Sequence, residues 1–482
     1  MSECIVYPMP GYALAHKAKY ELQVRAKGSD EWKQVPIYAV TVDMHDPREA
    51  GMAQFDFTGE VEVKITYNRF SPIYQASIHP KSLEIVPEVE GSELRFNLTK
   101  PANLAVVVNN DRFHNLHLFA RAIEPAPDKT APNVLVIKER MQGVDIMHES
   151  GPLNDRIRAL GDHPIVYFEK GYHSMGEFLW KVPSNTTVYF EGGAVFRGGF
   201  VLEDVENVRI YGRGIIDQKA FGQISGAHGV RIQRSKNIEI QDLTFLDPGH
   251  YTVYIGNSSQ VRIQNVCSFS CEGWTDGIDM MSCEDVTVSG GFLRTSDDCI
   301  AIYGSRWQNY GDSRRILVEN ITLWADVAHP MMIGTHGDHQ RNGDIIEDMT
   351  FRNIDVLDQH EMQPEYLGVM AIAPGDKNLV RRIRYEDIRV ERITHGRLFE
   401  FCVKYNSDYN PAPGRGIEDV TACNIFVTSC EGEEVSRVAG YDSERMVKRI
   451  TFENIVRDGR RAENFEDAKI NVGNFAEQIE IR

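Results

Sequence analysis

The sequence lacks the clustered positive charge that a nucleic-acid partner requires. Its 482 residues include 52 Lys and Arg against 70 Asp and Glu, which gives a formal net charge of −18. Phosphate backbones are bound through grouped Lys and Arg side chains, so this balance argues against binding of DNA or RNA. The sequence also has no basic run or basic helical pattern that could attach it to an anionic membrane surface.

Long apolar runs are missing as well. No stretch approaches the roughly 18 consecutive apolar residues of a membrane-spanning helix, which excludes that class of protein. The opening MSECIVYPMPGYALAHK lacks the charged segment and the apolar run of about 7–15 residues that mark a secretion signal. We therefore expect a cytoplasmic protein, or a secreted one if a signal has been removed.

Cysteine pairs of the CxxC type are absent, although the sequence has eight cysteines. Four of them fall between 267 and 299, but their spacings do not match those of zinc sites, and several lie in apolar segments that look like strands. We expect buried thiols that stay reduced. No metal and no cofactor is expected.

Two parts of the sequence have different patterns. Residues 1–123 contain short alternating segments such as YELQVRA and ELRFNL, separated by turn residues, which predicts an antiparallel β-sandwich. Residues 124–134 begin with EPAPDKTAP, whose three prolines indicate a stiff linker. Residues 135–482 form the second domain in this interpretation.

One β-rich unit recurs through the second part. Its apolar anchor positions are 23 to 37 residues apart, and such a recurrence is typical of a solenoid. A leucine-rich repeat is excluded because the leucine ladder is missing, and a propeller blade would need about 40–45 residues. We predict an all-β chain, in which an N-terminal β-sandwich is followed by a right-handed parallel β-helix. The expected anchors are Val208, Ile238, Val261, Val286, Ile316, Met349, Ile383, Val420, Ile450 and Ile479.

Four aspartates gather within about one coil of this solenoid. Asp297 and Asp298 precede the apolar run CIAI, where buried charge is costly unless it is used. Asp276 lies 21 residues before Asp297, and Asp279 follows it closely. Residues one coil apart stack on one face, so we expect the carboxylates to lie roughly 5–10 Å apart. That range suits the acid and the base of glycoside hydrolysis, and crowded carboxylates raise one another's pKa. Spacing alone leaves open two alternatives, turn capping and a calcium site.

The motif TDGID (275–279), followed by DDCIAI (297–302) and by a histidine in AHPMMIG (328–334), resembles glycoside hydrolase family 28, the polygalacturonase family. Upstream, EGGAVF (191–196) and GRGIIDQ (212–218) also resemble the early coils of that family. The likeness covers about residues 160–460.

This resemblance implies roles for four residues. Asp297 would be the general acid, while Asp276 and Asp298 would position the attacking water, with inversion at the anomeric carbon. His329 would hydrogen-bond the acid and shape its protonation.

Departures from the family pattern bear on the substrate. Trp274 stands where the family has Asn, and Tyr303 stands where it has Lys. The two cations that grip a galacturonate carboxylate should fall in GVMAIAP (368–374), where we read Met370 and Ile372. Their loss removes a charge-assisted clamp for an acidic sugar. The plan of a sandwich, a β-helix and three aspartates also resembles the dextranase and isopullulanase family, which acts on neutral α-glucans.

We therefore expect a glycoside hydrolase whose partner is an α-linked polysaccharide or oligosaccharide. Loops rich in aromatic residues and histidine fit a carbohydrate cleft, with Trp274 and Tyr303 stacking on sugar rings. The assigned substrate-binding residues are Trp274, Asp279, Tyr303, His250 and Arg306.

Three alternatives stay open at this point. The first is a polygalacturonase proper, whose clamp is rebuilt from Arg306, Arg341 or Lys377. The second is a β-helix polysaccharide lyase, whose products would absorb ultraviolet light. The third is a carbohydrate-binding β-helix protein without catalysis, which would not need the aspartate motifs.

Overall fold

The computed structural model describes residues 2–482 except 12, 14, 16–18, 70, 140–149 and 223–225; of residues 150 and 176–178 it describes the backbone alone. Within this part of the chain the fold is almost entirely β-structure, with one α-helix, α1 (Ser150–Arg158), and two short 3-10 helices, Lys81–Leu83 and Lys219–Phe221. None of these described helices is long and apolar enough to cross a membrane.

The N-terminal part is a β-sandwich of two sheets that enclose one apolar core. Alternation of side chains explains the packing: along β6, Val61, Val63 and Ile65 are buried, and the residues between them are half-buried. The described pairings of the sandwich are antiparallel, as predicted, apart from the parallel pair β5–β11. The long stretch between those two strands gives the chain room for the crossover that a parallel pair needs.

One sheet of the sandwich holds β1 (Glu3–Val6), β4 (Tyr38–Val42), β5 (Arg48–Thr58), β7 (Ala76–His79), β10 (Ala102–Val108) and β11 (Leu116–Ala122). The other holds β2 (Tyr20–Ala26), β3 (Lys33–Val35), β6 (Val61–Tyr67), β8 (Glu88–Glu90) and β9 (Glu93–Leu98).

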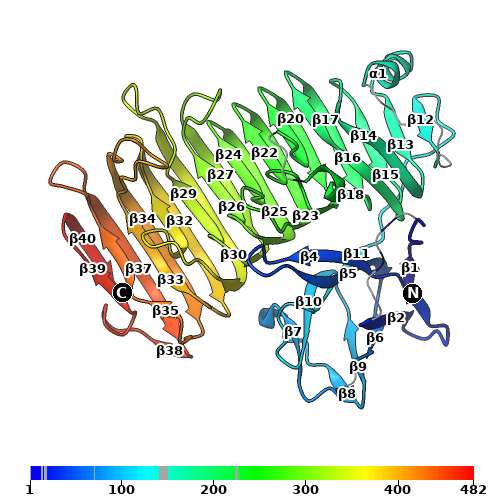
Figure 1. Ribbon diagram of the computed structural model, residues 1–482, viewed down its shortest axis with the longest axis horizontal. Coiled ribbons are helices and arrows are strands. Elements are labelled where there is room, and N and C mark those ends of the chain that lie inside the picture. Colours follow the sequence, from blue (N-terminus) through cyan, green and yellow to red (C-terminus); the bar gives the residue numbers. More distant parts are fainter. Residues whose placement is uncertain are drawn as a thin grey trace.

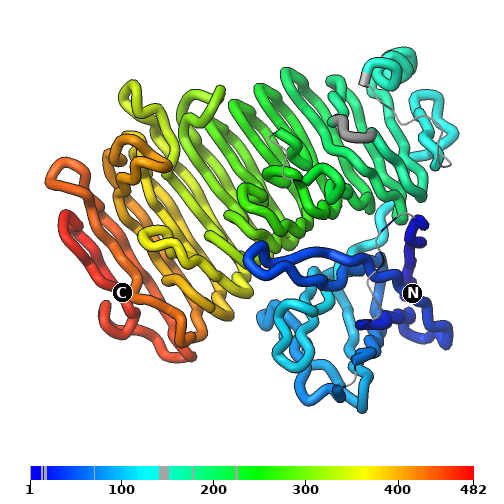
Figure 2. The backbone as a smooth tube through the Cα atoms, in the orientation of Figure 1, coloured from blue at the N-terminus to red at the C-terminus, as the bar shows by residue number. Residues whose placement is uncertain are grey.

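From β12 onward the chain winds into a parallel β-helix, the predicted solenoid. Each strand pairs in parallel with a strand one coil later, apart from the short antiparallel pair β37–β38. Figure 1 shows the coils side by side from α1 to the C-terminus, with the sandwich beneath the middle coils. The tube in Figure 2 follows the same coils one after another. Three strips of sheet result, here called faces A, B and C.

Face A consists of β12 (Val134–Ile137), β13 (Ile165–Phe168), β15 (Thr187–Phe190), β17 (Glu206–Gly212), β20 (Lys236–Gln241), β27 (Ser313–Glu319), β40 (Ala476–Ile481) and the first halves of β23 (Ser259–Phe269), β25 (Glu284–Thr295), β30 (Ile345–Gln359), β32 (Leu379–Val390), β34 (Gly416–Val427) and β37 (Val447–Arg457), which β38 (Arg460–Arg461) follows. Face B consists of β18 (Ile215–Asp217), β21 (Thr244–Leu246), β28 (Thr322–Ala325), the first halves of β14 (Gly171–Lys181) and β16 (Ala194–Glu203), and the second halves of those long strands of face A.

Face C begins with the second halves of β14 and β16. It continues with β19 (Val230–Gln233), β22 (Val253–Gly256), β24 (Ile278–Met281), β26 (Ile300–Tyr303), β29 (Met331–Gly334), β31 (Gly368–Ala373), β33 (Gly396–Cys402), β35 (Glu433–Glu434), β36 (Ser436–Ala439) and β39 (Ile470–Val472).

The ten anchors predicted from the sequence form one ladder along face A. Each is the direct partner of the next, from Val208 opposite Ile238 to Ile450 opposite Ile479. Nine of the ten side chains belong to the buried core of the solenoid, and Ile479 packs against it. The repeat prediction is confirmed because an apolar residue that must face inward in every coil fixes the register of that coil.

Face B is the face that docks on the sandwich. Phe119 and Met52 of the sandwich pack in one cluster with Phe269, Phe292 and other face B side chains, and the Phe119 and Phe269 rings stack with centroids 6.0 Å apart. Because the sandwich covers face B, a binding site on the middle coils has to use face A, face C or the corners beside them.

Candidate active site

The aspartate motifs meet where face B turns into face C, in successive coils. Asp276 precedes β24, Asp297 and Asp298 precede β26, and His329 precedes β29. Backbone bonds stack these corners: Gly277 N–H donates to the Asp298 carbonyl at 2.8 Å, and Cys299 N–H to the His329 carbonyl at 2.8 Å. Residues more than 50 positions apart in sequence are thereby held in one column.

The carboxyl groups of Asp276, Asp297 and Asp298 form one cluster. One oxygen from each lies within 4.8 Å of the others. This separation is shorter than the 5–10 Å expected from rung spacing, because the side chains converge at the corner. Asp276 and Asp298 are buried, whereas Asp297 keeps part of its surface exposed.

Hydrogen bonds fix the orientation of the aspartate pair. Asp297 accepts the backbone N–H of Trp274 at 2.8 Å on Oδ2 and that of Asp298 at 3.0 Å on Oδ1. Asp298 Oδ1 accepts the His329 backbone N–H at 3.0 Å and lies 2.7 Å from His329 Nδ1. The resemblance implied that His329 hydrogen-bonds the acid, Asp297. In the structure His329 instead hydrogen-bonds Asp298, which precedes the neighbouring strand at the same corner.

Burial raises the pKa of the clustered carboxyls. For Asp297 the pKa rises to about 6, first because the group is buried and then because Asp298 is close. Burial, followed by the charges of Asp279 and Asp297, raises the pKa of Asp276 well above its ordinary value. Burial alone would lower the pKa of His329, but the charge and hydrogen bond of Asp298 outweigh it and raise that pKa. At neutral pH the cluster therefore retains protons that isolated aspartates would lose.

Asp279 and Arg306 lie beside this cluster with unused hydrogen-bonding capacity. Asp279 is fully buried, and apart from its contact with the Asp276 carboxyl, neither of its oxygens accepts a hydrogen bond from a described residue. The Arg306 Nη1 atom lies 3.8 Å from Asp279 Oδ2, too far for a direct bond, and has no described partner either. These atoms of Asp279 and Arg306 therefore have hydrogen-bonding capacity that no described residue uses, apart from the Asp276 contact.

Trp274 and Tyr303 differ in their availability to a substrate. Trp274 is 65% exposed, so it is a surface side chain at the catalytic corner and not a core residue. Tyr303 is buried beneath the Arg306 guanidinium, 4.8 Å from its ring centroid, and the edge of His336. The expectation that Tyr303 stacks on a sugar is therefore wrong; its hydroxyl instead points to Asp298 at 3.5 Å.

His250 belongs to an aromatic group next to the cluster. Its ring lies 4.7 Å from that of His228 and 5.9 Å from that of Trp307. Burial, with a smaller effect from Arg306, lowers its pKa to about 4, so the ring is neutral at pH 7.

The segment expected to hold the uronate clamp has no cation. Met370 and Ile372 lie in the solenoid core, opposite Met331 and Ile333 of β29, so side chains at these two positions could not have faced a cleft. Successive residues of a strand face opposite sides, so residues next to these two face outward. The outward positions of β31 are Ala371 and Ala373, which are uncharged as well.

Three basic residues were proposed to rebuild the clamp, and among the described contacts only Arg306 approaches the carboxyl cluster, at 3.8 Å from Asp279. Arg341 is exposed and pairs with Asp338. Lys377 donates to the Arg341 carbonyl at 2.9 Å in an exposed loop.

Sequence reasoning missed the residues that hold the loops over face C. Buried Asp344 accepts the Ser305 backbone N–H at 2.7 Å and the Asp338 backbone N–H at 2.9 Å, so one carboxylate joins two loops. Buried Asn309 donates to the Tyr254 hydroxyl at 2.5 Å. Their signal in the sequence is weak, since Asp and Asn in a polar loop usually indicate a turn.

A cation could also use the three catalytic carboxylates. They are the one group of three or more acidic, His or Cys ligands that the described residues bring together. They would supply three of the six to eight oxygens that Ca²⁺ takes. The absence of a metal stays a prediction.

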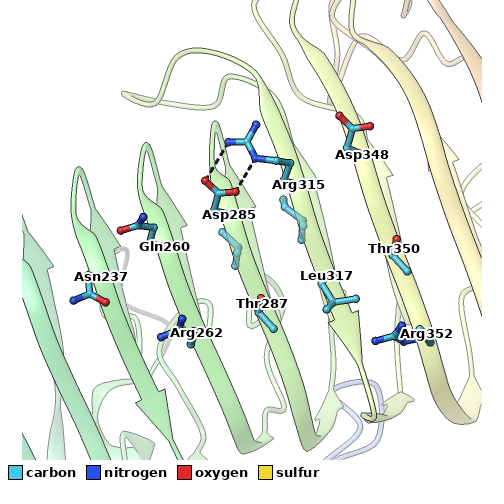
Figure 3. Close-up of a pocket in the computed structure, with 12 residues that line it drawn as sticks. Asn237, Gln260, Arg262, Asp285, Thr287, Arg315, Leu317, Asp348, Thr350 and Arg352 are labelled. Carbon is cyan, nitrogen blue, oxygen red and sulfur yellow. Dashed lines mark hydrogen bonds and ion pairs between the residues drawn. The ribbon is translucent and has the colours of Figure 1, made fainter.

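A second polar region lies on face A. It is a hollow of about 670 Å³ that includes Arg262, Asp285, Arg315 and Thr350 in its lining (Figure 3). Asp285 pairs there with Arg315 at 2.7 Å, as the dashed lines show. This hollow is separate from the candidate active site, which lies where face B turns into face C.

Comparison with known proteins gives the family. The family model for glycosyl hydrolases family 28 matches residues 185–469, more than half of the chain and all of the catalytic corner. The chain belongs to glycosyl hydrolase family 28. The resemblance read from the aspartate motifs is confirmed at the level of the family.

Among curated relatives of this family 28 chain, an exopolygalacturonase from Cochliobolus carbonum is 23% identical over 270 residues, covering 51% of this chain and 53% of the relative. A polygalacturonase from Brassica napus is 23% identical over 292 residues, covering 55% and 70% respectively. The first relatives match over about half of their length or less.

Two solved structures cover nearly the whole family 28 chain. Dex49A from Penicillium minioluteum has a TM-score of 0.62 at 14% identity and covers 99% of this chain and 96% of its own. A family 28 exopolygalacturonase from Yersinia enterocolitica has a TM-score of 0.53 at 11% identity and covers 92% and 98%. At these identities the likeness shows the fold, a β-domain joined to a parallel β-helix, and no more.

Proposed function

We propose that the protein hydrolyses an α-linked glycan or oligosaccharide with inversion, by means of three aspartates. Asp297 gives its proton to the glycosidic oxygen as the bond from the anomeric carbon breaks. A water held by Asp276 and Asp298 adds its oxygen to that carbon and loses a proton to the pair. The convergence of three carboxyl oxygens within 4.8 Å carries this proposal.

Asp297 is the best placed of the three to act as the acid. It is the least buried, so a substrate oxygen can reach it beside the exposed Trp274. Its pKa of about 6 leaves an appreciable protonated fraction near neutral pH. An acid whose pKa lies close to the working pH is the efficient one.

Asp276 and Asp298 are suited to hold the water. An oxygen that accepts two hydrogen bonds of about 2.8 Å at a tetrahedral angle separates their acceptors by about 4.5 Å, close to the limit of 4.8 Å found here. The contact with His329 Nδ1, at 2.7 Å, fixes the orientation of the Asp298 carboxyl. Two carboxyl groups this close usually indicate retention; here the third carboxyl makes direct attack by water the favoured route.

The charges in the site favour a neutral sugar. Four carboxyl groups face one guanidinium, that of Arg306, and the outward residues of β31 are alanines. A uronate carboxylate would enter a region already rich in negative charge, and a buried charge without a partner costs several kcal/mol, by order of magnitude about 3–5. Hydroxyl groups carry no such cost.

The second candidate is a polygalacturonase whose clamp is Arg306. The position of Arg306 favours it, since its side chain is partly exposed beside the carboxyl cluster and a guanidinium pairs well with a carboxylate. The names of the relatives, polygalacturonase and exopolygalacturonase, point in the same direction.

The test is a screen of the purified protein on neutral α-linked hexasaccharides and on hexagalacturonate, read by release of reducing ends. We expect activity on a neutral member, and loss of it in Asp297→Asn. A matched variant on face A, Asp285→Asn, keeps it. Preference for hexagalacturonate that disappears in Arg306→Gln would select the second candidate, and ultraviolet-absorbing products would indicate a lyase instead.

A further inference from the structure

A small hairpin from the coil of β26 folds back over face C. Arg306 and Asn309 exchange backbone hydrogen bonds of 3.0 Å each, which closes a tight turn with Trp307 and Gln308 at its tip. Trp307 adopts a φ of +54°, a value that such a turn imposes on the residue. The hairpin therefore has its own fixed shape.

This hairpin lies on coils that precede its own. The Trp307 ring is parallel to that of Tyr254 in β22, with an interplanar angle of 3° and centroids 5.9 Å apart. Asn309 donates to the Tyr254 hydroxyl at 2.5 Å and accepts a bond of 3.4 Å from Gln233 in β19. β22 lies two coils before β26, and β19 lies three coils before it.

A second contact fastens the base of the hairpin. The Asn257 side chain donates to the Tyr310 carbonyl at 2.9 Å and accepts the Tyr310 N–H at 3.1 Å. Asn309 and Tyr254 are buried in consequence. The hairpin is held at its tip and at its base, so it forms a fixed wall.

The wall stands directly beside the catalytic cluster. Tyr254 is the register partner of Asp279, and Asp279 is the partner of Ala301 one coil later. A glycan chain laid along face C past Asp279, toward the N-terminal coils, would meet Trp307 and Asn309 after one rung, about 5 Å. That distance is roughly the length of one sugar ring. The hairpin therefore closes the site on the side of the N-terminal coils.

The charged groups beneath this wall are covered by it. Asp279 Oδ2 and Arg306 Nη1 are both buried and face one another at 3.8 Å. The guanidinium lies at the first residue of the hairpin and the carboxylate lies in β24, so their attraction holds the base of the hairpin against the catalytic coil.

We infer that the site takes the end of a glycan chain and releases one sugar at a time. This inference rests on the proposed hydrolysis, to which it adds the mode of action. The hairpin Arg306–Tyr310 blocks extension of the chain beyond the first sugar on the side of the N-terminal coils. The substrate class is therefore oligosaccharides and chain ends, in preference to the interior of polymers.

The experiment follows the products from hexasaccharides labelled at the reducing end, at less than about a tenth conversion. The probes are isomaltohexaose, maltohexaose and hexagalacturonate. We expect a single sugar and its labelled or unlabelled five-unit complement at early times, with no two-, three- or four-unit fragments. Such internal fragments from the outset would overturn the chain-end pocket while leaving the hydrolase standing. Failure to cleave any probe would overturn the proposed hydrolysis, and the pocket with it.

Two variants separate an effect at the hairpin from general damage. Arg306→Gln should lower kcat/KM on the hexasaccharide by tenfold or more, since it removes the positive charge that faces Asp279 and Asp276. Arg341→Gln, which changes an exposed arginine of a neighbouring loop, should leave kcat/KM unchanged. Replacement of residues 306–310 by two glycines should admit internal cleavage of a long polymer. If that variant unfolds, the product pattern of the unmodified protein still decides.

Discussion

Faces A and C of the solenoid both carry many carboxylates, but the two faces differ in whether these carboxylates are hydrogen-bonded to arginine. On face A, aspartates near the start of the strand pair with an arginine one coil later: Asp285 with Arg315, Asp348 with Arg382, and Asp419 with Arg449. In the turn that leads to face A, Asp204 pairs with Arg234 in the same way. These hydrogen bonds to arginine lower the pKa of the aspartates.

At the corner of face C no arginine of the described structure hydrogen-bonds Asp276, Asp279 or Asp297. Arg306 approaches Asp279 only to 3.8 Å, and the pKa values of the three carboxyls are raised. In this fold, carboxylates hydrogen-bonded to arginine belong to the regions that stabilise the solenoid. Carboxyls without such a hydrogen bond belong to the candidate active site. Perturbed carboxyls in a partly open corner are typical of catalytic groups.

The largest effect should come from the water-holding pair. Asp276→Asn and Asp298→Asn each remove a carboxylate that positions the water, and we expect kcat to fall by about 10²–10⁴-fold, the usual contribution of a positioned acid or base. Asp348→Asn on face A is the matched control and should keep full activity. If initial rates of reducing-end release fell equally in all three variants, the contrast between the faces would be lost.

The pH dependence of activity should follow the acid. Asp297 must hold its proton to protonate the leaving oxygen, and its pKa is about 6. We expect kcat/KM to decline above about pH 6, by roughly tenfold per pH unit once the group is ionised. The decline can be measured as kcat/KM in buffers of constant ionic strength between pH 4 and 9. A flat profile up to pH 8 would exclude Asp297 as the group that limits the rate.

The variant Asp297→Asn should raise the stability of the folded protein although it removes the activity. The folded-state pKa of Asp297, about 6, lies above its ordinary value of 3.8. Its contribution to stability is therefore fully present below about pH 4 and is lost as the pH rises through 6. Asp297→Asn avoids this loss.

We expect Asp297→Asn to raise the free energy of unfolding at pH 7 by up to about 3 kcal/mol. The gain should vanish near pH 4. Urea denaturation of both proteins at the two pH values measures it. A variant that is less stable than the parent at pH 7 would show that the carboxylate is not strained in the folded protein.

The smallest effect is expected on face A. Arg382 pairs with Asp348 at 2.6 Å and with Glu347 at 2.7 Å, and its side chain is 43% exposed. Exposed pairs of this kind contribute about 0.2–1 kcal/mol, less in high salt. Arg382→Gln should therefore lower the midpoint of thermal unfolding slightly, with no change in kcat. A large loss of stability that persists in 1 M salt, or a loss of activity, would contradict the purely structural interpretation of face A.

The sequence allowed most of the fold to be predicted, for a physical reason. An apolar side chain must enter the core once in every coil, so positions such as Val286 and Ile316 could be matched without a structure. The aspartates that converge at the corner could be named for the same reason, because they follow strands that stack in register.

The remainder depends on directions that a sequence does not display. In β31, Met370 faces the core and its neighbour Ala371 faces outward. Whether His329 bonds Asp297 or Asp298, and whether Tyr303 is covered by Arg306, depends on how side chains lean at a corner. The backward course of the hairpin at Trp307 depends on contacts with residues about 50 positions earlier.

The stereochemistry of the first-formed product tests the central claim most directly. Proton NMR spectra recorded immediately after the enzyme is mixed with an α-linked oligosaccharide that it cleaves distinguish the two anomers before they interconvert. The account predicts the β-anomer first, because a water held by Asp276 and Asp298 attacks the face opposite the leaving group. The α-anomer first would mean that one of the clustered carboxylates attacks the sugar itself, and the assignment of the water to this pair would be wrong.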